Sequence, residues 1–352
     1  MDGMTALLSK IGGKRMKRVL WLLLALCLLA AGGAAQSVPL TDYAPGQMID
    51  VGFCDPAVFL SGCTLESGKG FILVDSQFYG GYLLRSTGRI VRDTITGGIT
   101  LLEGDRAEVT AQDENSCEVR IWNDRVSRTY AFALAPTQVS PDRWVLKSHT
   151  CRKDGRVFSA QFGHDRVQAV ETTAVGTEEY TAYYEFYAEA NNLDHERIPA
   201  SIADVKRLEK AYPVAAVSPD DPGTRVNLRK APSAKSERVG SLYSGTRLRI
   251  REITDDGWAK ISVGDMDAYI STDYLTFGAA LEQVPDARPT AKLPDQEWVE
   301  VSRKPYRGGG GTVTQVRGGQ QVSVIGEYNG EWRMVQEQEW QNTFFIQASQ
   351  LR

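Results

Sequence analysis

Four cysteines beyond the first 35 residues are the residues whose chemistry is easiest to state. Cys54, Cys63, Cys117 and Cys151 form an even set, and an even number in an exported domain is typical of a disulfide framework. Three pairings are possible. Cys54 with Cys63 would close a short loop, and Cys117 with Cys151 would join two predicted strands. Buried free thiols are the alternative.

Histidines and paired carboxylates are the other residues that could do chemistry. A cysteine nucleophile needs a histidine base and a group that orients it, and three histidines could hold zinc. His149, His164 and His195 are scattered along the chain without a His-Glu-x-x-His motif, which favours exposed histidines in turns. Glu178 and Glu179 are adjacent, so on a strand they point to opposite faces and form no glycosidase pair. We therefore expect no catalytic residues, no metal and no cofactor.

The first 35 residues have the three parts of a signal peptide. A basic segment at 14–18 precedes an uninterrupted apolar run at 19–31, and Gly32-Gly33-Ala34-Ala35 supplies small residues for cleavage after Ala35. The apolar run is shorter than the roughly 20 residues that span a bilayer. We predict export from a bacterial cytoplasm to the cell envelope or beyond, and an uncleaved membrane anchor is the alternative.

The charge balance argues against nucleic acid as a partner. Residues 1–35 carry five of the 40 basic residues and one of the 44 acidic ones, so the remainder has 35 against 43 and a formal charge of −8. Binding of nucleic acid without sequence preference requires a basic face.

Residues 36–212 alternate short β segments with turns and predict an antiparallel β-rich domain, either a meander, a sandwich or a barrel. A short helix is expected at its end, because Ile202, Val205, Leu208 and Tyr212 follow a helical spacing after Pro199 and Ser201. Predicted strands lie at 71–75, 82–85, 107–111, 117–122, 128–134, 144–148, 157–162, 166–172 and 181–187.

Two proline-containing stretches are interpreted as connections rather than as parts of a domain. Residues 213–223 and 279–296 are the predicted linkers, and they delimit two units at 224–278 and 297–352. The fold class is thus mainly β throughout, with one helix.

The two units repeat one another. Val226, Leu228 and Pro232 recur 73 residues later, and Leu248, Ile250, Trp258 and Ile261 recur after 74 as Val322, Val324, Trp332 and Val335. Changes in the offset fall between predicted strands, as insertions in loops do. The last third of the chain is therefore predicted to be a tandem repeat of small β domains.

The first unit resembles the bacterial SH3 domain. The resemblance lies in four segments that occur in order: Val226–Ser233, Val239–Leu242 with Gly245, Gly257–Ile261, and Ala268–Ile270 with Tyr274-Leu275. The second unit is similar but degenerate, since a glycine run at 308–311 replaces a turn. The resemblance implies two small β-barrels that accompany envelope proteins and bind peptidoglycan peptide or another protein.

A barrel of this size has no interior cavity, so a ligand must bind on loops and aromatic side chains. The predicted ligand-binding residues are Tyr243, Trp258, Tyr269 and Tyr274 in the first unit and Trp332 and Phe344 in the second. Packing over the barrel core is the alternative for Trp258 and Tyr269.

The predicted function is that of an exported, non-catalytic protein whose C-terminal modules bind cell-wall peptide or an envelope protein. In the alternative, the β-rich domain is a ligand-binding or hydrolytic domain that the modules localise to the cell wall.

Overall fold

The computed structural model describes residues 43–49, 57–76, 80–86, 90–99, 101–102, 104–135, 143–186, 197–305, 313–337 and 343–351. The predicted signal peptide, Cys54 and His195 lie outside these ranges. Within them, no helix has the length and apolar character needed to cross a membrane.

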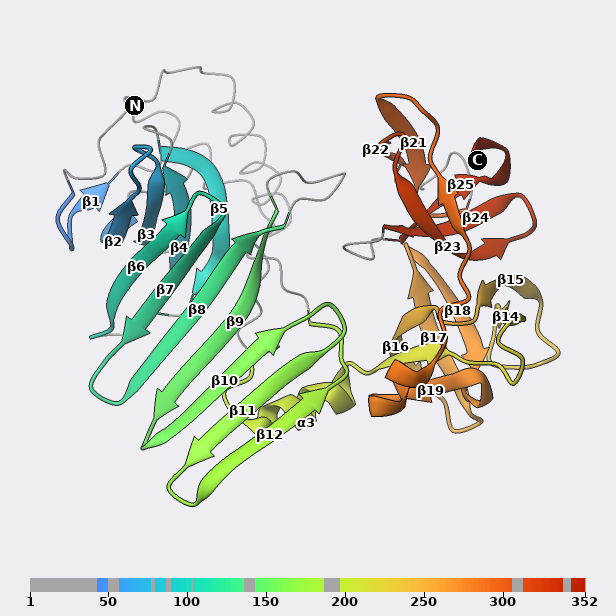
Figure 1. Ribbon diagram of the computed structural model, residues 1–352, viewed down its shortest axis with the longest axis horizontal. Helices are drawn as coiled ribbons and strands as arrows, with labels where there is room; N and C mark the ends of the chain where they lie inside the picture. The colour runs from blue at the N-terminus through green and yellow to red at the C-terminus, as the bar shows by residue number, and fades with distance from the viewer. Residues whose placement is uncertain are drawn as a thin grey trace, which may run out of the picture.

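The chain forms a β-rich domain and a pair of small β modules beside it (Figure 1). The β-rich domain contains two antiparallel sheets, in each of which neighbours along the chain are neighbours in the sheet. The first sheet consists of β1 (Met48–Ile49), β2 (Ala57–Thr64), β3 (Gly70–Ser76), β4 (Gly80–Ser86) and β5 (Ile90–Ile99). The second consists of β6 (Arg106–Asp113), β7 (Ser116–Trp122), β8 (Val126–Leu134), β9 (Trp144–Lys153), β10 (Arg156–Phe162), β11 (Val167–Thr173) and β12 (Gly176–Ala182). The predicted mainly β, antiparallel fold is confirmed, as a meander.

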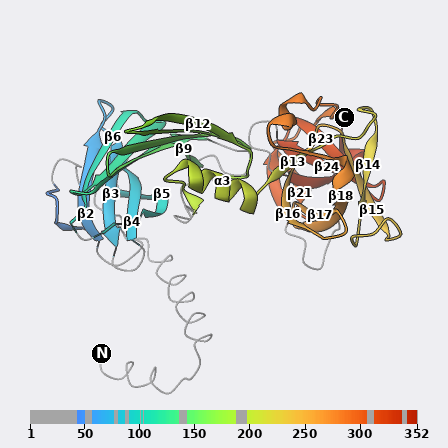
Figure 2. The same ribbon diagram turned by 90° about the horizontal axis from the view of Figure 1, so that it is seen from below.

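One hydrophobic core joins the two sheets and the helix of this domain. Phe71 and Leu83 reach it from the first sheet, Phe132 and Phe158 from the second, and Val205 from the helix. Figure 2 shows the helix, α3 (Ile202–Ala211), beneath the arc of the second sheet. Alternate side chains of each strand point to the same face, so a single amphipathic helix can cover the apolar face of the second sheet.

Helix α3 begins where the sequence predicts. The Ser201 side chain accepts a hydrogen bond from the Asp204 backbone N–H, and Ile202, Val205 and Leu208 are buried. A serine at this position satisfies an N–H group that the first turn leaves unpaired.

The segment predicted as the first linker is instead a buried strand. All four residues of β13 (Val214–Val217) are buried, and the strand pairs with β16 and β19. The second predicted linker likewise contains β20 (Thr290–Lys292), which pairs with β23. Each of these strands is short and flanked by prolines, which is why the sequence pattern indicated a linker where the chain forms the first strand of a module.

The first module contains β13, β14 (Arg225–Arg229), β15 (Arg238–Tyr243), β16 (Arg247–Ile253), β17 (Trp258–Val263), β18 (Met266–Ser271), the short helix η4 (Thr272–Tyr274), β19 (Leu275–Phe277) and η5 (Gly278–Gln283). The second contains β20, β21 (Trp298–Ser302), β22 (Val313–Arg317), β23 (Gln321–Tyr328), β24 (Trp332–Glu337), β25 (Thr343–Gln347) and η6 (Ala348–Gln350). The strand order β13-β16-β17-β18-β14-β15 of the first corresponds to β20-β23-β24-β25-β21-β22 of the second.

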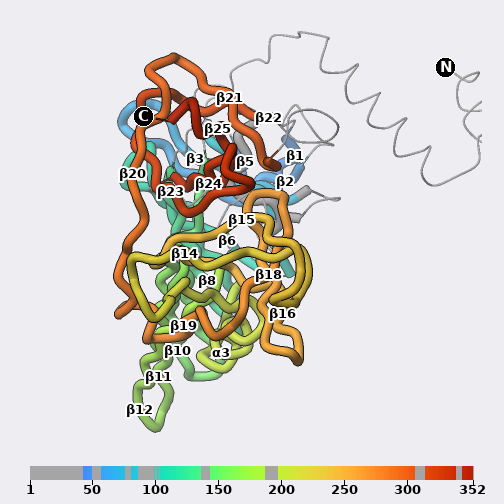
Figure 3. Tube along the Cα trace, turned by 90° about the vertical axis from the view of Figure 1, so that its right-hand side faces the viewer, coloured from blue at the N-terminus to red at the C-terminus, as the bar shows by residue number. Residues whose placement is uncertain are grey.

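The two modules share one continuous sheet, because the edge strand β15 pairs with β23 (Figure 3). Opposite one another in this ladder are Gly240 and Tyr328, Ser241 and Glu327, and Leu242 and Gly326. A Cβ atom at Gly326 would lie 2.3 Å from the Ser241 carbonyl oxygen, and one at Gly240 would lie 2.4 Å from that of Glu327. The backbones approach so closely that only glycine fits at these two positions.

One of the three possible pairings, Cys117 with Cys151, does not fit this fold. Cys117 lies on β7 and Cys151 on β9, with β8 between them. Strands two apart are separated by roughly 10 Å, whereas the Cα atoms of a disulfide lie within about 7 Å of one another. Cys63, Cys117 and Cys151 are free thiols in this structure, and the pairing of Cys54 with Cys63 stays a prediction.

We predict that Gly326→Ala destabilises the modules by about 1–3 kcal/mol, because the new methyl group forces β15 and β23 apart. Differential scanning calorimetry of the whole chain measures the effect as a lower transition temperature. Gly223→Ala is the matched control, since its Cβ would meet only the Asp221 side chain, at 3.7 Å. Equal shifts for both variants would contradict the role assigned to the junction.

We also predict that Cys117 and Cys151 react slowly with thiol reagents in the native protein. Burial raises the pKa of both thiols, and the neighbouring Cys63 raises that of Cys117 further, so little thiolate forms near neutral pH. Labelling followed by peptide mass spectrometry should find both sites modified only after unfolding, with no link between them. Recovery of a Cys117–Cys151 cross-linked peptide from the native protein would refute the strand order.

Candidate binding face of the first module

The outer face of the β17–β18 hairpin groups two of the predicted aromatic residues. In the ladder, Trp258 lies opposite Ser271 and Lys260 lies opposite Tyr269, so Trp258 and Tyr269 are diagonal neighbours. Both side chains are half-buried. The residues that follow them in sequence, Ala259 and Ile270, are buried in the barrel. Trp258 and Tyr269 therefore do not fill the barrel core.

Charged groups flank this aromatic pair. The Lys260 ammonium lies 3.1 Å from the Asp267 carboxylate, and this hydrogen bond raises the pKa of Lys260. Asp267 also accepts a hydrogen bond from the Ser262 hydroxyl at 2.7 Å, which holds the pKa of the carboxyl below its ordinary value. Arg229 of β14 lies opposite Tyr269. The face thus combines two flat rings with fixed charges of both signs.

A tight turn holds the end of this face in place. The Thr272 N–H and hydroxyl both donate to the Gly257 carbonyl oxygen, at 2.9 and 2.8 Å. Gly257 itself has a positive φ of 77°, which glycine adopts without the strain of a side chain. Tyr274 follows in η4 and is 42% exposed. We define the binding face as Arg229, Trp258, Lys260, Asp267, Tyr269 and Tyr274.

The corresponding face of the second module is buried against the first. Trp332 matches Trp258 in the repeat, and it packs with Ile325, Met334 and Phe345 in the core of the first module. The same positions in the first module carry Arg251, Lys260 and Tyr269. Apolar residues have replaced polar ones where the face is covered. A loss of polar residues in one copy of a repeat is therefore the sequence signal that could have identified the covered face.

Three of the predicted ligand-binding residues lie elsewhere than on an open face. Phe344 is buried in the core of the second module, and Trp332 is buried at the junction, so the structure contradicts their prediction as surface residues. Tyr243 packs against the core of the second module, with the Arg225 guanidinium 5.6 Å from its ring centre. A single repeat unit cannot show which side chains a neighbouring unit covers.

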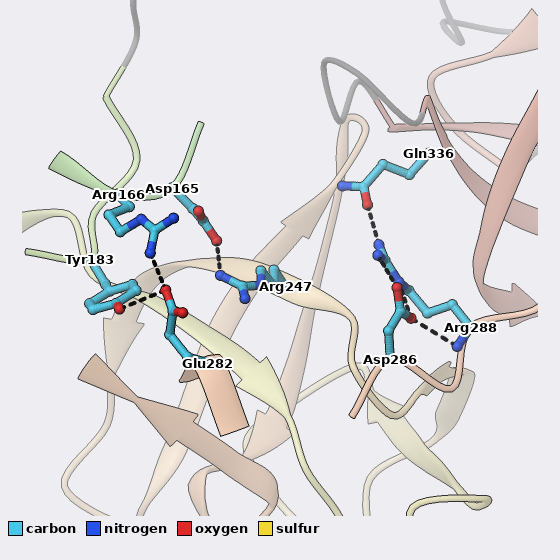
Figure 4. A network of polar contacts seen from close by, with 8 residues as sticks. All are labelled: Asp165, Arg166, Tyr183, Arg247, Glu282, Asp286, Arg288 and Gln336. Carbon is cyan, nitrogen blue, oxygen red and sulfur yellow. Dashed lines mark hydrogen bonds and ion pairs between the residues drawn. The ribbon is translucent and has the colours of Figure 1, made fainter. Parts of the chain in front are cut away.

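Charged contacts fix the first module against the β-rich domain (Figure 4). Arg247 pairs with Asp165, and Glu282 pairs with Arg166 while accepting a hydrogen bond from the Tyr183 hydroxyl at 3.0 Å. Apolar contact among Tyr183, Val214, Ala216 and Leu281 lies in the same joint. These contacts set the direction in which the module presents its outer surface.

The second connection is anchored across both modules. Asp286 accepts two hydrogen bonds from the Arg288 guanidinium, at 2.7 and 2.6 Å, and Arg288 also donates to the Gln336 side chain at 2.8 Å. The Arg288 guanidinium holds the pKa of Asp286 below its ordinary value. Residues 285–293 are thus held in place by hydrogen bonds and are not a free tether.

The β-rich domain places one histidine and one cysteine on the same face of β9. His149 and Cys151 are separated by one residue and both are buried. The His149 Nδ1–H donates to the Pro199 carbonyl oxygen at 3.0 Å, and its ring stacks on Tyr130 with centroids 4.8 Å apart. Burial lowers the pKa of His149 to about 4 and raises that of Cys151, so neither group is activated as a base or a nucleophile. The prediction of an exposed turn histidine is therefore wrong for His149, whereas His164 is exposed in its turn.

Among the described residues, no three histidine, cysteine, aspartate or glutamate side chains gather into a group that could hold a metal ion.

Comparison with known proteins places the family resemblance in the first module. Residues 224–276 match the family described as the bacterial SH3 domain, so the chain contains a bacterial SH3 domain. The match begins just before β14, ends within β19 and includes Trp258, Tyr269 and Tyr274.

No curated protein matches the chain in sequence. A solved structure, NlpC2 from Trichomonas vaginalis, is 17% identical and is matched over 40% of this chain and 48% of its own, with a TM-score of 0.19. The chain thus spans about half the length of that structure. A likeness of this size supports no conclusion about fold or function.

We predict that His149 makes the protein less stable as the pH falls from 6.5 to 4. The pKa is about 4 in the folded chain, below the ordinary 6.5, so over this range the unfolded chain takes up a proton that the folded chain does not. The free energy of unfolding should be lower by about 3 kcal/mol at pH 4 than it would be without this pKa difference. His149→Gln should flatten this part of the stability profile measured by urea unfolding, and His164→Gln should leave it unchanged. An unaltered slope in His149→Gln would show that other groups cause the acid sensitivity.

Proposed function

We propose that this protein is an exported, non-catalytic component of the bacterial cell envelope that binds cell-wall peptide through the binding face of its first module. The observation that carries the proposal is the contrast between the two modules. One copy of the aromatic face is covered by its neighbour, and the other keeps Trp258 and Tyr269 half-buried among charged side chains.

The chemistry of the face fits an extended peptide. Flat, stiff rings provide contact area at small cost in side-chain entropy, and peptides of the wall carry both free amino groups and carboxylates that Asp267 and Lys260 complement in charge. The match of residues 224–276 to the bacterial SH3 domain supports the same role.

The joint between the β-rich domain and the first module supports a positioning role for the larger domain. Arg249 pairs with Glu185 at 2.6 Å, and the Ile250 N–H donates to the Pro213 carbonyl oxygen at 3.0 Å. Both contacts come from β16, so the hairpin β17–β18 next to it has a fixed orientation. The β-rich domain would then hold the binding face in a fixed orientation relative to itself.

We predict that the full chain sediments with purified peptidoglycan, and that Trp258→Ala and Tyr269→Ala each weaken this binding about tenfold or more. Loss of one well-packed aromatic contact typically costs about 1–2 kcal/mol or more. The bound fraction at increasing peptidoglycan concentration measures the effect, with circular dichroism to confirm the fold.

Trp298→Ala is the matched control, because Trp298 is 45% exposed on β21 of the second module. Binding that survives both substitutions in the first module would rule out the face, and absence of any sedimentation would rule out wall binding. Clearing of a cell-wall zymogram by the purified protein would overturn the non-catalytic assignment.

A further inference from the structure

Three arginines converge on a single carboxylate where the two modules meet. Glu327 of β23 lies 2.7 Å from Arg225 of β14, 3.7 Å from Arg238 of β15 and 3.6 Å from Arg333 of β24. The first two arginines belong to the first module, and Glu327 and Arg333 belong to the second. The cluster exists only because β15 and β23 are paired.

The charges of this cluster do not balance. Three guanidinium groups carry three positive charges, and Glu327 supplies one negative charge. Among the described residues, no other carboxylate lies within ion-pair distance of Arg225, Arg238 or Arg333. The nearest acidic residue in sequence to Arg238, Glu237, pairs with Lys230 instead. Two positive charges are left over in a chain whose overall formal charge is −4.

The surplus charge faces solvent. Side chains of Arg225, Arg238 and Arg333 are 41%, 50% and 30% exposed, whereas that of Glu327 is 17% exposed. The carboxylate therefore lies beneath the guanidinium groups. A guanidinium has five N–H donors in a planar fork that matches a carboxylate. Arg225 uses one nitrogen on Glu327, and its other nitrogens can reach a second acceptor.

A buried hydroxyl on the same face also lacks a partner. Ser241 lies directly opposite Glu327 in the β15–β23 ladder, so both side chains project from the same face of the sheet. Ser241 is completely buried, and its Oγ atom has no hydrogen-bond partner. Unpaired buried polar atoms are uncommon because each costs about 1–3 kcal/mol. This hydroxyl is therefore an unpaired polar group close to the charged cluster.

We propose that Arg225, Arg238 and Arg333 form a binding site for the carboxylate of a peptide, at the junction of the two modules and separate from the binding face. A carboxylate is the ligand class that the site already accepts, since Glu327 bridges all three arginines. A ligand here competes with Glu327 for the same donors.

The test uses two synthetic peptides, both N-acetylated and built from neutral residues, one with a free C-terminal carboxylate and one with a C-terminal amide. Binding to the full chain is measured by NMR chemical-shift titration. We expect the free carboxylate to bind and the amide not to bind. Inorganic phosphate is titrated separately. Equal binding of both peptides, no binding of either, or binding of phosphate without the carboxylate peptide would each overturn the proposal.

Two variants should change this affinity in opposite directions. Arg238→Gln removes an exposed donor and should raise the Kd of the carboxylate peptide about tenfold, as expected for a hydrogen bond between charged groups. Glu327→Gln removes the competing carboxylate and should lower the Kd. A purely structural cluster would give losses or no change in both. A higher Kd in Glu327→Gln, with the fold retained, would therefore count against the site.

Arg251→Gln is the control for charge alone. Arg251 is exposed on the first module, outside the cluster, and contacts Ser262. The substitution should leave the Kd of the carboxylate peptide unchanged. If Arg251→Gln raised the Kd as much as Arg238→Gln does, the effect would be a general attraction by positive charge, and the site would be refuted. Trp258→Ala should also leave it unchanged, so failure of this site and failure of wall binding are distinguishable.

Discussion

The contact between strands β15 and β23 is the constraint on which the arrangement of the modules depends. Antiparallel neighbours lie about 4.8 Å apart, and here the carbonyl oxygens of Ser241 and Glu327 occupy the space that side chains would need at Gly326 and Gly240. Glycine at both positions turns two free sheet edges into one shared sheet. An unpaired edge exposes a row of hydrogen-bonding groups, so this pairing also protects each module from pairing with other chains.

Because of this contact, the equivalent outer faces of the two modules differ in exposure. Once β15 lies on β23, the outer face of β24 and β25 is covered, and Met334 and Phe345 become part of the core of the first module. Lys260 and Tyr269 at the matching positions stay at the surface. Of two modules with corresponding strand orders, one thus buries this face in the junction and the other keeps Trp258 and Tyr269 on an outer face.

The β-rich domain is held together by different means. Its two meanders and α3 share one apolar core. The side chain of Asp105 is almost fully buried and is paired with Arg128 at 2.7 Å. Asn123 donates a further hydrogen bond to the Asp105 carboxylate, also at 2.7 Å. A buried carboxylate is tolerated only when its acceptor sites are filled in this manner. The edge strand β12, by contrast, carries Glu178 and Glu179 at the surface, and such polar edges are the hardest strands to predict.

Sequence alone determined the features that depend on local pattern. Alternation of apolar residues predicted most of the strands, helical spacing with Ser201 predicted α3, and four ordered segments predicted the bacterial SH3 domain at the place where the family matches. These features depend on residues that are close in the sequence, because the strand and helix periods of 2 and 3.6 residues repeat within a few positions.

The tertiary structure determined the features that depend on which segments pack against one another. It turned the supposed linkers into the strands β13 and β20, separated Cys117 from Cys151 by an intervening strand, buried Phe344 and Trp332, and left Trp258 and Tyr269 on an outer face. The same aromatic residue at matching repeat positions is covered in one module and open in the other. The physical reason is that burial is a property of the partner surface, and a residue's own sequence neighbours do not specify that surface.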